Sequence, residues 1–209
     1  TSLHNPARCV GVPHVHIADG VLPTSLCLAA AGLSGAGVYA FSRGMRPEEA
    51  PRIGLLAAAA FLASVVHFPV AGVSMHFGLY GLLGILLGKR SFAVVAATLV
   101  LQTLLLQHGG IVSIGVNAMN MGIGALAAWG VWSLSGLPVR LRAFAAGFVG
   151  AMLPAVMMAS EFYLAEYGKG FFAVTALYIV VAVAEGALTM ALVDCFRRLK
   201  PEALATAPA

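Results

Sequence analysis

The chain has 209 residues, of which 60% are hydrophobic and 10% are charged, and its formal net charge is +4. With a mean hydropathy of +0.94, this composition excludes an ordinary soluble domain. The sequence contains no basic run with interleaved aromatic residues, so we expect no nucleic-acid partner. Its three cysteines form no C-x-x-C motif, which argues against a disulfide framework and against a thiolate zinc site.

Apolar segments separated by short polar connections predict an all-α, polytopic membrane protein with about seven transmembrane helices. The segments are 22–42, 53–67, 77–88, 91–107, 117–134, 143–164 and 171–194. A membrane-spanning helix needs about 20 apolar residues, and most of the segments approach that length. The two short ones flank the stretch between His67 and His76, which we expect to dip into the membrane as a loop packed against protein.

The regions outside the spans suggest one domain with two short ends. Residues 1–14 form an N-terminal extension, and 15–196 form the transmembrane unit. Residues 197–209 are basic and then rich in Ala and Pro, so we expect a disordered cytoplasmic tail. The location predicted for the chain is the cytoplasmic membrane of a bacterium or archaeon, in contact with membrane lipid.

The basic residues predict the orientation. When successive connections alternate between the two sides, only Arg8 and Lys169 fall on one side. The other side receives Arg43, Arg46, Arg52, Lys89, Arg90, Arg140, Arg142, Arg197, Arg198 and Lys200. Because Lys and Arg collect on the cytoplasmic face, the N-terminus is expected outside and the C-terminus inside. All six histidines then lie at or near the outer face: His4, His14, His16, His67, His76 and His108.

Small residues are concentrated in the first two spans, at 29–37 and at 57–63. Such residues allow helix backbones to approach closely. They could serve ordinary packing inside the bundle, or they could form a face that binds a partner membrane subunit.

The first candidate metal ligand is His16, in the segment His16-Ile17-Ala18-Asp19-Gly20. A histidine beside a flexible segment can chelate through its ring and its own backbone nitrogen. If the chain began at Val15, the free amine would add a third nitrogen, a set that suits nickel(II) or copper(II). The alternative is an outer tail with an incidental histidine.

The other candidate residues follow along the chain. His76 opens a glycine-spaced segment, with His67 at the other edge of the same loop, and His108 precedes two glycines. Asn117 and Asn120 are three residues apart on one helical face. These asparagines could orient a liganding imidazole or simply connect helices, and each histidine taken alone could be structural. Glu185, inside the last span, is expected to have a structural or coupling role rather than to bind metal.

The sequence lacks the motifs of several enzyme classes. It has no G-x-x-x-x-G-K-[ST], no H-E-x-x-H and no G-x-S-x-G. We therefore expect that the chain is not an enzyme and that any ATP hydrolysis occurs on other subunits. An intramembrane metalloenzyme and a metal sensor or assembly subunit remain the alternatives.

The quoted blocks together resemble the CbiM/NikM family, the substrate-binding membrane (S) components of nickel and cobalt energy-coupling-factor transporters. The resemblance rests on His16 to Gly20, the loop ending at His76, 107–121 and Ala184-Glu185-Gly186. It implies a seven-helix bundle that captures Ni²⁺ or Co²⁺ at the outer face for import. It also implies a transmembrane coupling subunit, two ATPase subunits and, as a further partner, a small accessory membrane subunit.

The resemblance also implies the ligands of the metal. They are the terminal amine at position 15, the ring and backbone nitrogens of His16, and His76. The family begins with Met-His, whereas this sequence has Val15 behind 14 further residues. Either Val15 marks a GTG start codon, or proteolysis must expose this amine, or the site functions without it.

Overall fold

The computed structural model describes residues 16–70, 73–165 and 171–205. The first half contains helices α1 (Thr24–Ser42), α2 (Ala50–Val65), α3 (Tyr80–Leu87) and α4 (Ser91–Leu106), the 3-10 turns η1 (Pro47–Glu49) and η2 (Gly88–Arg90), and strands β1 (His67–Val70) and β2 (Val73–His76). The second half contains helices α5 (Ile114–Trp132), α6 (Val139–Leu164), α7 (Phe171–Leu199) and α8 (Glu202–Ala205). The predicted all-α class is confirmed, with one small hairpin added.

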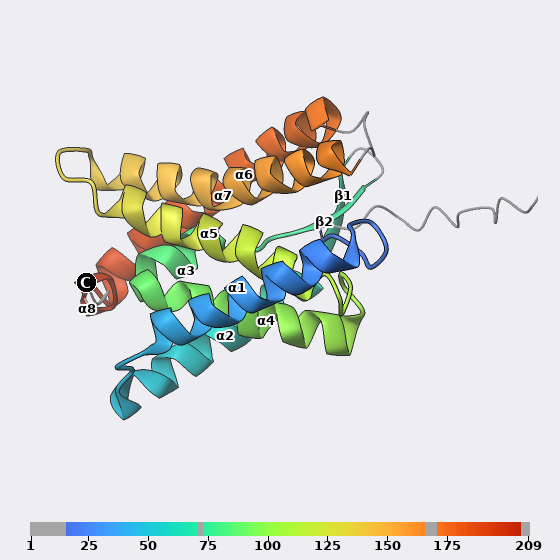
Figure 1. Cartoon of the computed structure of the whole chain (residues 1–209). Helices are drawn as coiled ribbons and strands as arrows, with labels where there is room; N and C mark the ends of the chain where they lie inside the picture. The colour runs from blue at the N-terminus through green and yellow to red at the C-terminus, as the bar shows by residue number, and fades with distance from the viewer. Residues whose placement is uncertain (1–15, 71–72, 166–170, 206–209) are drawn as a thin grey trace, which may run out of the picture.

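The helices run back and forth along one direction, as a polytopic membrane protein requires (Figure 1). The connections α1–α2, α3–α4 and α5–α6 lie at one end together with α8, which we call the inner end. The hairpin and the connection 107–113 lie at the other end, the outer end. This arrangement gathers the ten basic residues at one end and His16, His67, His76 and His108 at the other.

Apolar helical segments long enough to cross a membrane confirm a multi-pass membrane protein. In the described part of the chain there are five, namely Thr24–Ser42, Tyr80–Leu106, Ile114–Trp132, Val139–Leu164 and Phe171–Leu199. The second of these contains α3, η2 and α4, which are separated where Gly88 takes a φ of +55°. Helix α2 has 16 residues, fewer than the about 20 that a membrane-spanning helix needs.

The stretch between the two short segments is a β-hairpin, not the irregular loop expected from the sequence. β1 and β2 pair antiparallel, with His67 opposite His76 and Phe68 opposite Met75. The pairing satisfies backbone groups that an irregular loop at this depth would leave exposed. After β2 the chain stays extended until Leu79, whose φ is +53°, so α3 begins later than the predicted residue 77.

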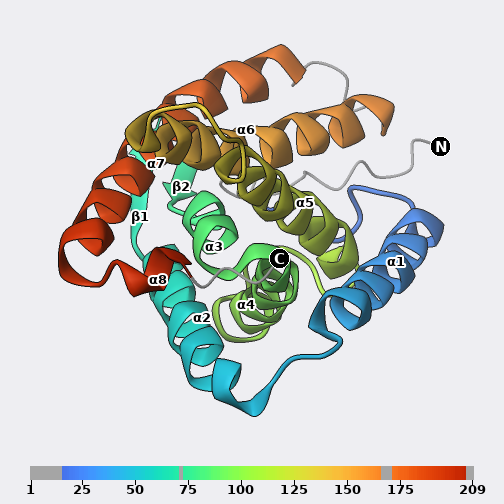
Figure 2. The ribbon, with the colours of Figure 1, turned by 90° about the vertical axis from the view of Figure 1, so that its left-hand side faces the viewer.

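Helix α3 lies at the centre of the bundle, surrounded by its neighbours when viewed along the helices (Figure 2). All eight of its residues are buried. A Cβ added to Gly81 would overlap the backbone of Gly147 in α6, and one added to Gly84 would overlap the carbonyl oxygen of Ala125 in α5. The glycines therefore allow backbone-to-backbone contact around a helix too short to span a membrane.

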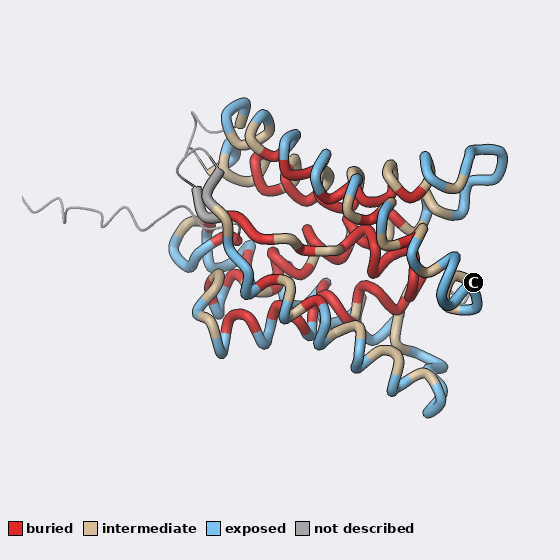
Figure 3. The backbone as a smooth tube through the Cα atoms, turned by 180° about the vertical axis from the view of Figure 1, so that it is seen from behind, coloured by how far each residue is buried: buried red, intermediate tan, exposed pale blue. Residues whose placement is uncertain are grey.

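Helix α1 lies at the periphery, where much of its surface is exposed (Figure 3). Only 11% of its apolar window is buried, compared with 78% for Tyr80–Leu106. Some of its small residues pack inside the bundle, since a Cβ on Gly37 would collide with the ring of Phe92. Others do not: a Cβ on Gly32 or Gly35, or on Gly54 of α2, would meet no atom within 4 Å.

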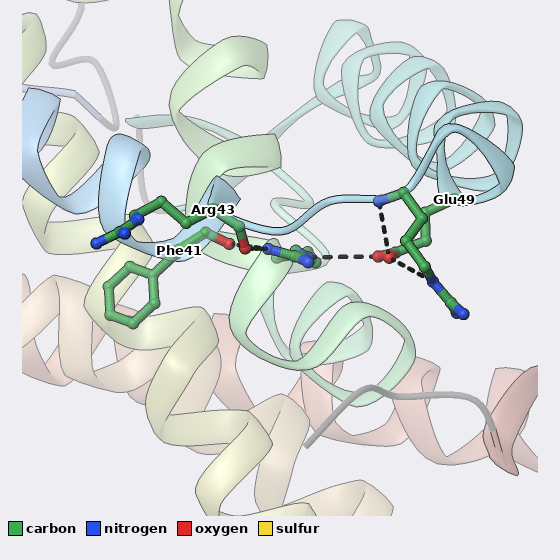
Figure 4. Close-up of polar contacts among 5 residues, drawn as sticks. Phe41, Arg43 and Glu49 are labelled. Carbon is green, nitrogen blue, oxygen red and sulfur yellow. Dashed lines mark hydrogen bonds and ion pairs between the residues drawn. The ribbon is translucent and has the colours of Figure 1, made fainter.

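A buried arginine organises the inner end (Figure 4). The Arg90 guanidinium donates hydrogen bonds to the carbonyl oxygens of Phe41 (2.7 Å) and Arg43 (2.8 Å) and forms an ion pair with Glu49 (3.3 Å). The backbone N–H of Arg46 also donates to Glu49 and, with Arg90, lowers the pKa of this carboxyl group. Arg90 thus holds the end of α1 and the start of α2 together.

The C-terminal region is more ordered than the sequence suggested. Helix α7 continues to Leu199 instead of ending at 194, and α8 follows it. The side chain of Arg52 donates to the carbonyl oxygen of Ala203 (2.6 Å) and to that of Leu86 (2.7 Å). The prediction of a disordered tail is therefore wrong for 197–205, because these contacts attach it to α2 and α3.

Candidate metal centre

The structure brings His16 and His76, which are 60 positions apart, into contact. Their Nε2 atoms are 3.4 Å apart, and both residues are buried, with exposed fractions of 3% and 4%. Two imidazole nitrogens that each lie about 2.0–2.1 Å from one metal ion are separated by about 2.9 Å at a right angle and about 3.4 Å at a tetrahedral angle. The pair is therefore spaced to share one ion.

His67 and His108 lie beside this pair. The ring centroid of His108 is 6.0 Å from that of His76 and 4.7 Å from that of His67, and the His67 and His76 centroids are 5.5 Å apart. His67 is exposed, and its Nδ1 lies 2.8 Å from the carbonyl oxygen of Val65. This contact favours the tautomer that donates from Nδ1 and leaves Nε2 as an acceptor.

Side chains alone do not complete a metal site. Within the described ranges, no group of three or more His, Cys, Asp or Glu side chains is arranged to hold a metal ion. The further donors expected from the family resemblance are the backbone nitrogen of His16 and the amine at position 15. Val15 lies outside the described residues, as do His4 and His14.

Burial keeps His76 in the form that binds metal. Its imidazole has a pKa lowered to about 4, mainly by desolvation and in part by the neighbouring His67 and His108, against a hydrogen bond with the carbonyl of Phe77 that raises it. A neutral imidazole has a free lone pair for a metal, whereas an imidazolium has none. His76 therefore remains a competent ligand at neutral pH without deprotonation.

Asn117 fixes the segment that carries His16. Its Oδ1 accepts a hydrogen bond from the backbone N–H of Ile17 (2.9 Å), and its Nδ2 donates to the Ile17 carbonyl (3.0 Å). The hydroxyl of Ser113 donates to the same carbonyl (2.6 Å). The Ile17 side chain is fully buried and packs in a cluster with Met75. The residue after His16 is thus held through both its backbone and its side chain.

Asp19 joins the same segment to the connection before α5. Its Oδ1 accepts hydrogen bonds from the backbone N–H groups of Val112 and Ser113, each at 2.9 Å. Glycine is required nearby, since a Cβ on Gly110 would collide with the Asp19 carboxylate. Neither contact was among the expectations from the sequence. The sole local signal for either contact is the Gly109-Gly110 pair.

The remaining polar candidates have other partners. Asn120 donates to Glu161 Oε2 (2.7 Å), which connects α5 to α6, and no hydrogen bond to an imidazole is seen for it in the described structure. Glu185 accepts from the backbone N–H of Gly78 (2.6 Å) and of Leu79 (3.2 Å). Glu185 thus holds the start of α3 through one of its carboxylate oxygens.

The fold defines a multi-pass cell-membrane protein, and four histidine rings lie close together at its outer end. The family model described as the cobalt uptake substrate-specific transmembrane region, CbiM, matches residues 16–203. The chain belongs to this family, and it is a membrane component of cobalt transport rather than an enzyme.

Individual relatives agree with this assignment. A putative metal transport protein of Haemophilus influenzae is 37% identical over 114 residues, which cover 54% of this chain and 55% of that protein. A putative cobalt transport protein CbiM of Methanocaldococcus jannaschii is 33% identical over 91% of this chain and 90% of its own length. A putative fused cobalt transport protein CbiMQ of Methanocorpusculum labreanum is 31% identical over 90% of this chain but only 36% of its own length.

A solved structure supports the fold independently. The crystal structure of a transition metal transporter superposes with a TM-score of 0.79, covering 88% of this chain and 93% of that one. The sequence identity of 21% limits this likeness to the fold.

Proposed function

We propose that this chain is the substrate-binding component of an energy-coupling-factor transporter and that it captures Co²⁺ or Ni²⁺ at the outer face for import. The observation that carries the proposal is the 3.4 Å approach of the buried His16 and His76 Nε2 atoms at the end with few basic residues. Borderline divalent metals favour imidazole ligands, and the burial of both rings favours a dehydrated ion.

The proposed ligands are the ring and backbone nitrogens of His16, the ring of His76 and an amine at position 15. The hydrogen bonds of Asn117 to both sides of Ile17 support this set, because they hold the backbone beside His16 in one place. His67 and His108 are expected to lie around the ion without being essential ligands. Four nitrogens from a compact chelate favour nickel(II), whereas the names of the relatives favour cobalt.

The proposed partners are a transmembrane coupling subunit and two ATPase subunits, with a small accessory membrane subunit as a further one. The chain lacks a P-loop motif, so energy from ATP must come from elsewhere. The fused relative, of which the aligned region is only 36%, is consistent with a second component joined to this one. The open small residues Gly32, Gly35 and Gly54 on α1 and α2 offer a surface for the coupling subunit.

Metal titration of histidine variants tests the proposed site. His16→Ala and His76→Ala should each abolish Co²⁺ and Ni²⁺ binding by the purified chain, because each removes an inner-sphere nitrogen. His4→Ala and His14→Ala are the controls and should bind as the parent does. Retention of binding by both His16→Ala and His76→Ala would overturn the proposal.

The amine is tested separately. A chain that begins with methionine at position 15 should bind metal more tightly than the 209-residue chain, because only the shorter one presents this amine. Intact-mass measurement must confirm that the extension is present in the longer sample. Equal affinities would remove the amine from the ligand set and leave the histidines in place.

Co-purification tests the partner surface. Bulky substitutions at Ala59 and Ala63 of α2 should weaken association with the coupling subunit without changing metal affinity. Leu62→Ala, on the same helix and 65% exposed in the parent, is the control for altered surface shape. If association is unchanged in both bulky variants, the surface around Ala59 and Ala63 does not bind the coupling subunit and contacts lipid instead.

A further inference from the structure

A small cavity is lined by His76 and by residues of the neighbouring helices. Its volume is about 20 Å³, and it is enclosed by the segment from β2 to α3 and by α5, α6 and α7. The side chains that bring chemistry to it are His76, Tyr80, Met121, Met158, Tyr178 and Glu185. A volume above about 10–15 Å³ accommodates one water molecule, so the cavity also accommodates one dehydrated metal ion.

Two of the residues that line this cavity each carry a buried oxygen atom with no hydrogen-bond partner within the described structure. These atoms are Oε2 of Glu185, a residue with an exposed fraction of 2%, and the hydroxyl of Tyr80, with 9%. The other carboxylate oxygen of Glu185 is occupied by the backbone N–H groups of Gly78 and Leu79. A buried polar atom without a partner destabilises the fold, and more so when it is charged, so these two oxygens call for a bound species between the helices.

The lining favours a transition-metal cation over water alone. Met121 and Met158 are both buried, with exposed fractions of 3%, and bring polarisable thioether sulfurs to the same space as the carboxylate. Thioethers form poor hydrogen bonds with water but are ligands for borderline and soft metals. Carboxylate oxygen supplies the negative charge that a divalent cation needs in a low-dielectric interior.

We propose that this cavity is a second metal-binding site, which receives Co²⁺ from the histidines and holds it on its way inward. The proposal rests on the proposed transport function. His76 borders both sites, so an ion moves from one to the other by exchanging His16 for Glu185, Tyr80 and the two thioethers. Oxygen and thioether donors bind a borderline metal less tightly than imidazoles do, and a transit site must release its ion.

Equilibrium binding of Co²⁺ to the full chain in lipid nanodiscs tests the site directly. The parent should bind a tight equivalent and a weaker second equivalent. Glu185→Gln should lose the second equivalent and keep the first, since the amide oxygen still accepts hydrogen bonds from Gly78 and Leu79. Glu161→Gln is the matched control, because it neutralises a half-buried carboxylate that does not line the cavity, and it should keep both equivalents.

Two further variants keep the test decisive if Glu185→Gln unfolds. Tyr80→Phe removes one oxygen, and the double change Met121→Leu with Met158→Leu removes the sulfurs at similar volume. Each should weaken the second equivalent at least about threefold while leaving the first unchanged. A single equivalent in the parent, or a second one that survives all these changes, would mean that the cavity holds only a structural water.

Uptake of Co²⁺ by cells that express the complete transporter provides the second readout. Glu185→Gln should lower the maximal rate about tenfold or more and leave the half-saturating Co²⁺ concentration unchanged, because capture at the histidines is intact. Uptake unchanged in Glu185→Gln but lost in His76→Ala would overturn this second site alone. Uptake unchanged in both variants would overturn the proposed function itself.

Discussion

The outer and inner ends of the molecule both fix a chain segment through a buried polar side chain, but they use opposite electrostatics. At the outer end the neutral amide of Asn117 binds both backbone groups of Ile17. At the inner end the charged guanidinium of Arg90 binds two carbonyl groups and the Glu49 carboxylate. Because the amide is neutral, it places no fixed positive charge beside His16 and His76 that would repel a metal cation. The inner end has no such constraint and can use stronger, charge-assisted hydrogen bonds.

The largest expected effect concerns which side of the membrane each end faces. A cysteine at Ile111, which is 68% exposed at the outer end, should react with an impermeant reagent from outside, and one at Arg140 only from inside. Cys9→Ser and Cys195→Ser provide the background, while the buried Cys27 remains. Reaction of both positions from the same side would refute the orientation.

The next effect is on stability at the inner end. Arg90→Met should lower the free energy of unfolding by about 3 kcal/mol, because the carbonyl groups of Phe41 and Arg43 lose charge-assisted donors. Co²⁺ affinity should stay within about twofold of the parent. Arg46→Met is the control: Arg46 pairs with the same carboxylate, but its side chain is 77% exposed, so its loss should leave the thermal midpoint nearly unchanged. Equal shifts for the two variants would contradict the role given to Arg90.

At the outer end, removing the polar side chain that fixes a chain segment should weaken metal binding. Asn117→Ala should weaken Co²⁺ binding about 10- to 100-fold, because side chains that position a ligand have effects of this size. Asn120→Ala is the matched control, three residues along α5, and should change affinity much less since its partner is Glu161. An equal loss for both would show that α5 packing, rather than the hydrogen bonds to Ile17, controls the site.

The smallest effect is expected at His67. Although its ring lies beside those of His76 and His108, it is exposed and not among the proposed ligands, so His67→Ala should weaken Co²⁺ binding less than about tenfold, below the effect of Asn117→Ala. A titration that ranks His67→Ala above Asn117→Ala would make His67 a ligand and overturn this order.

The multi-pass, helical architecture was predictable, because apolar segments long enough to cross a membrane alternate with short polar connections in the sequence. The hairpin and the late start of α3 were not predictable, because an apolar run such as 77–88 has the same composition whether it is extended or helical. His16 and His76 were selected by family resemblance, and their contact needed the fold. The bonds that join Asp19 to Val112 and Ser113, and Ser113 to Ile17, span 93 to 96 positions, and apart from the Gly109-Gly110 pair no local pattern indicates them.

The glycine contacts around α3 also determine where this chain can change in evolution. Any side chain at Gly81 or Gly84 must displace a whole neighbouring helix, so even alanine is expected to be rejected there. Gly32, Gly35 and Gly54 lie against open space and should accept many residues in the isolated chain. A saturation mutagenesis library would therefore show an intolerant centre inside a permissive periphery. Intolerance at those peripheral glycines, if it appeared only in the assembled transporter, would mark the surface where a partner binds.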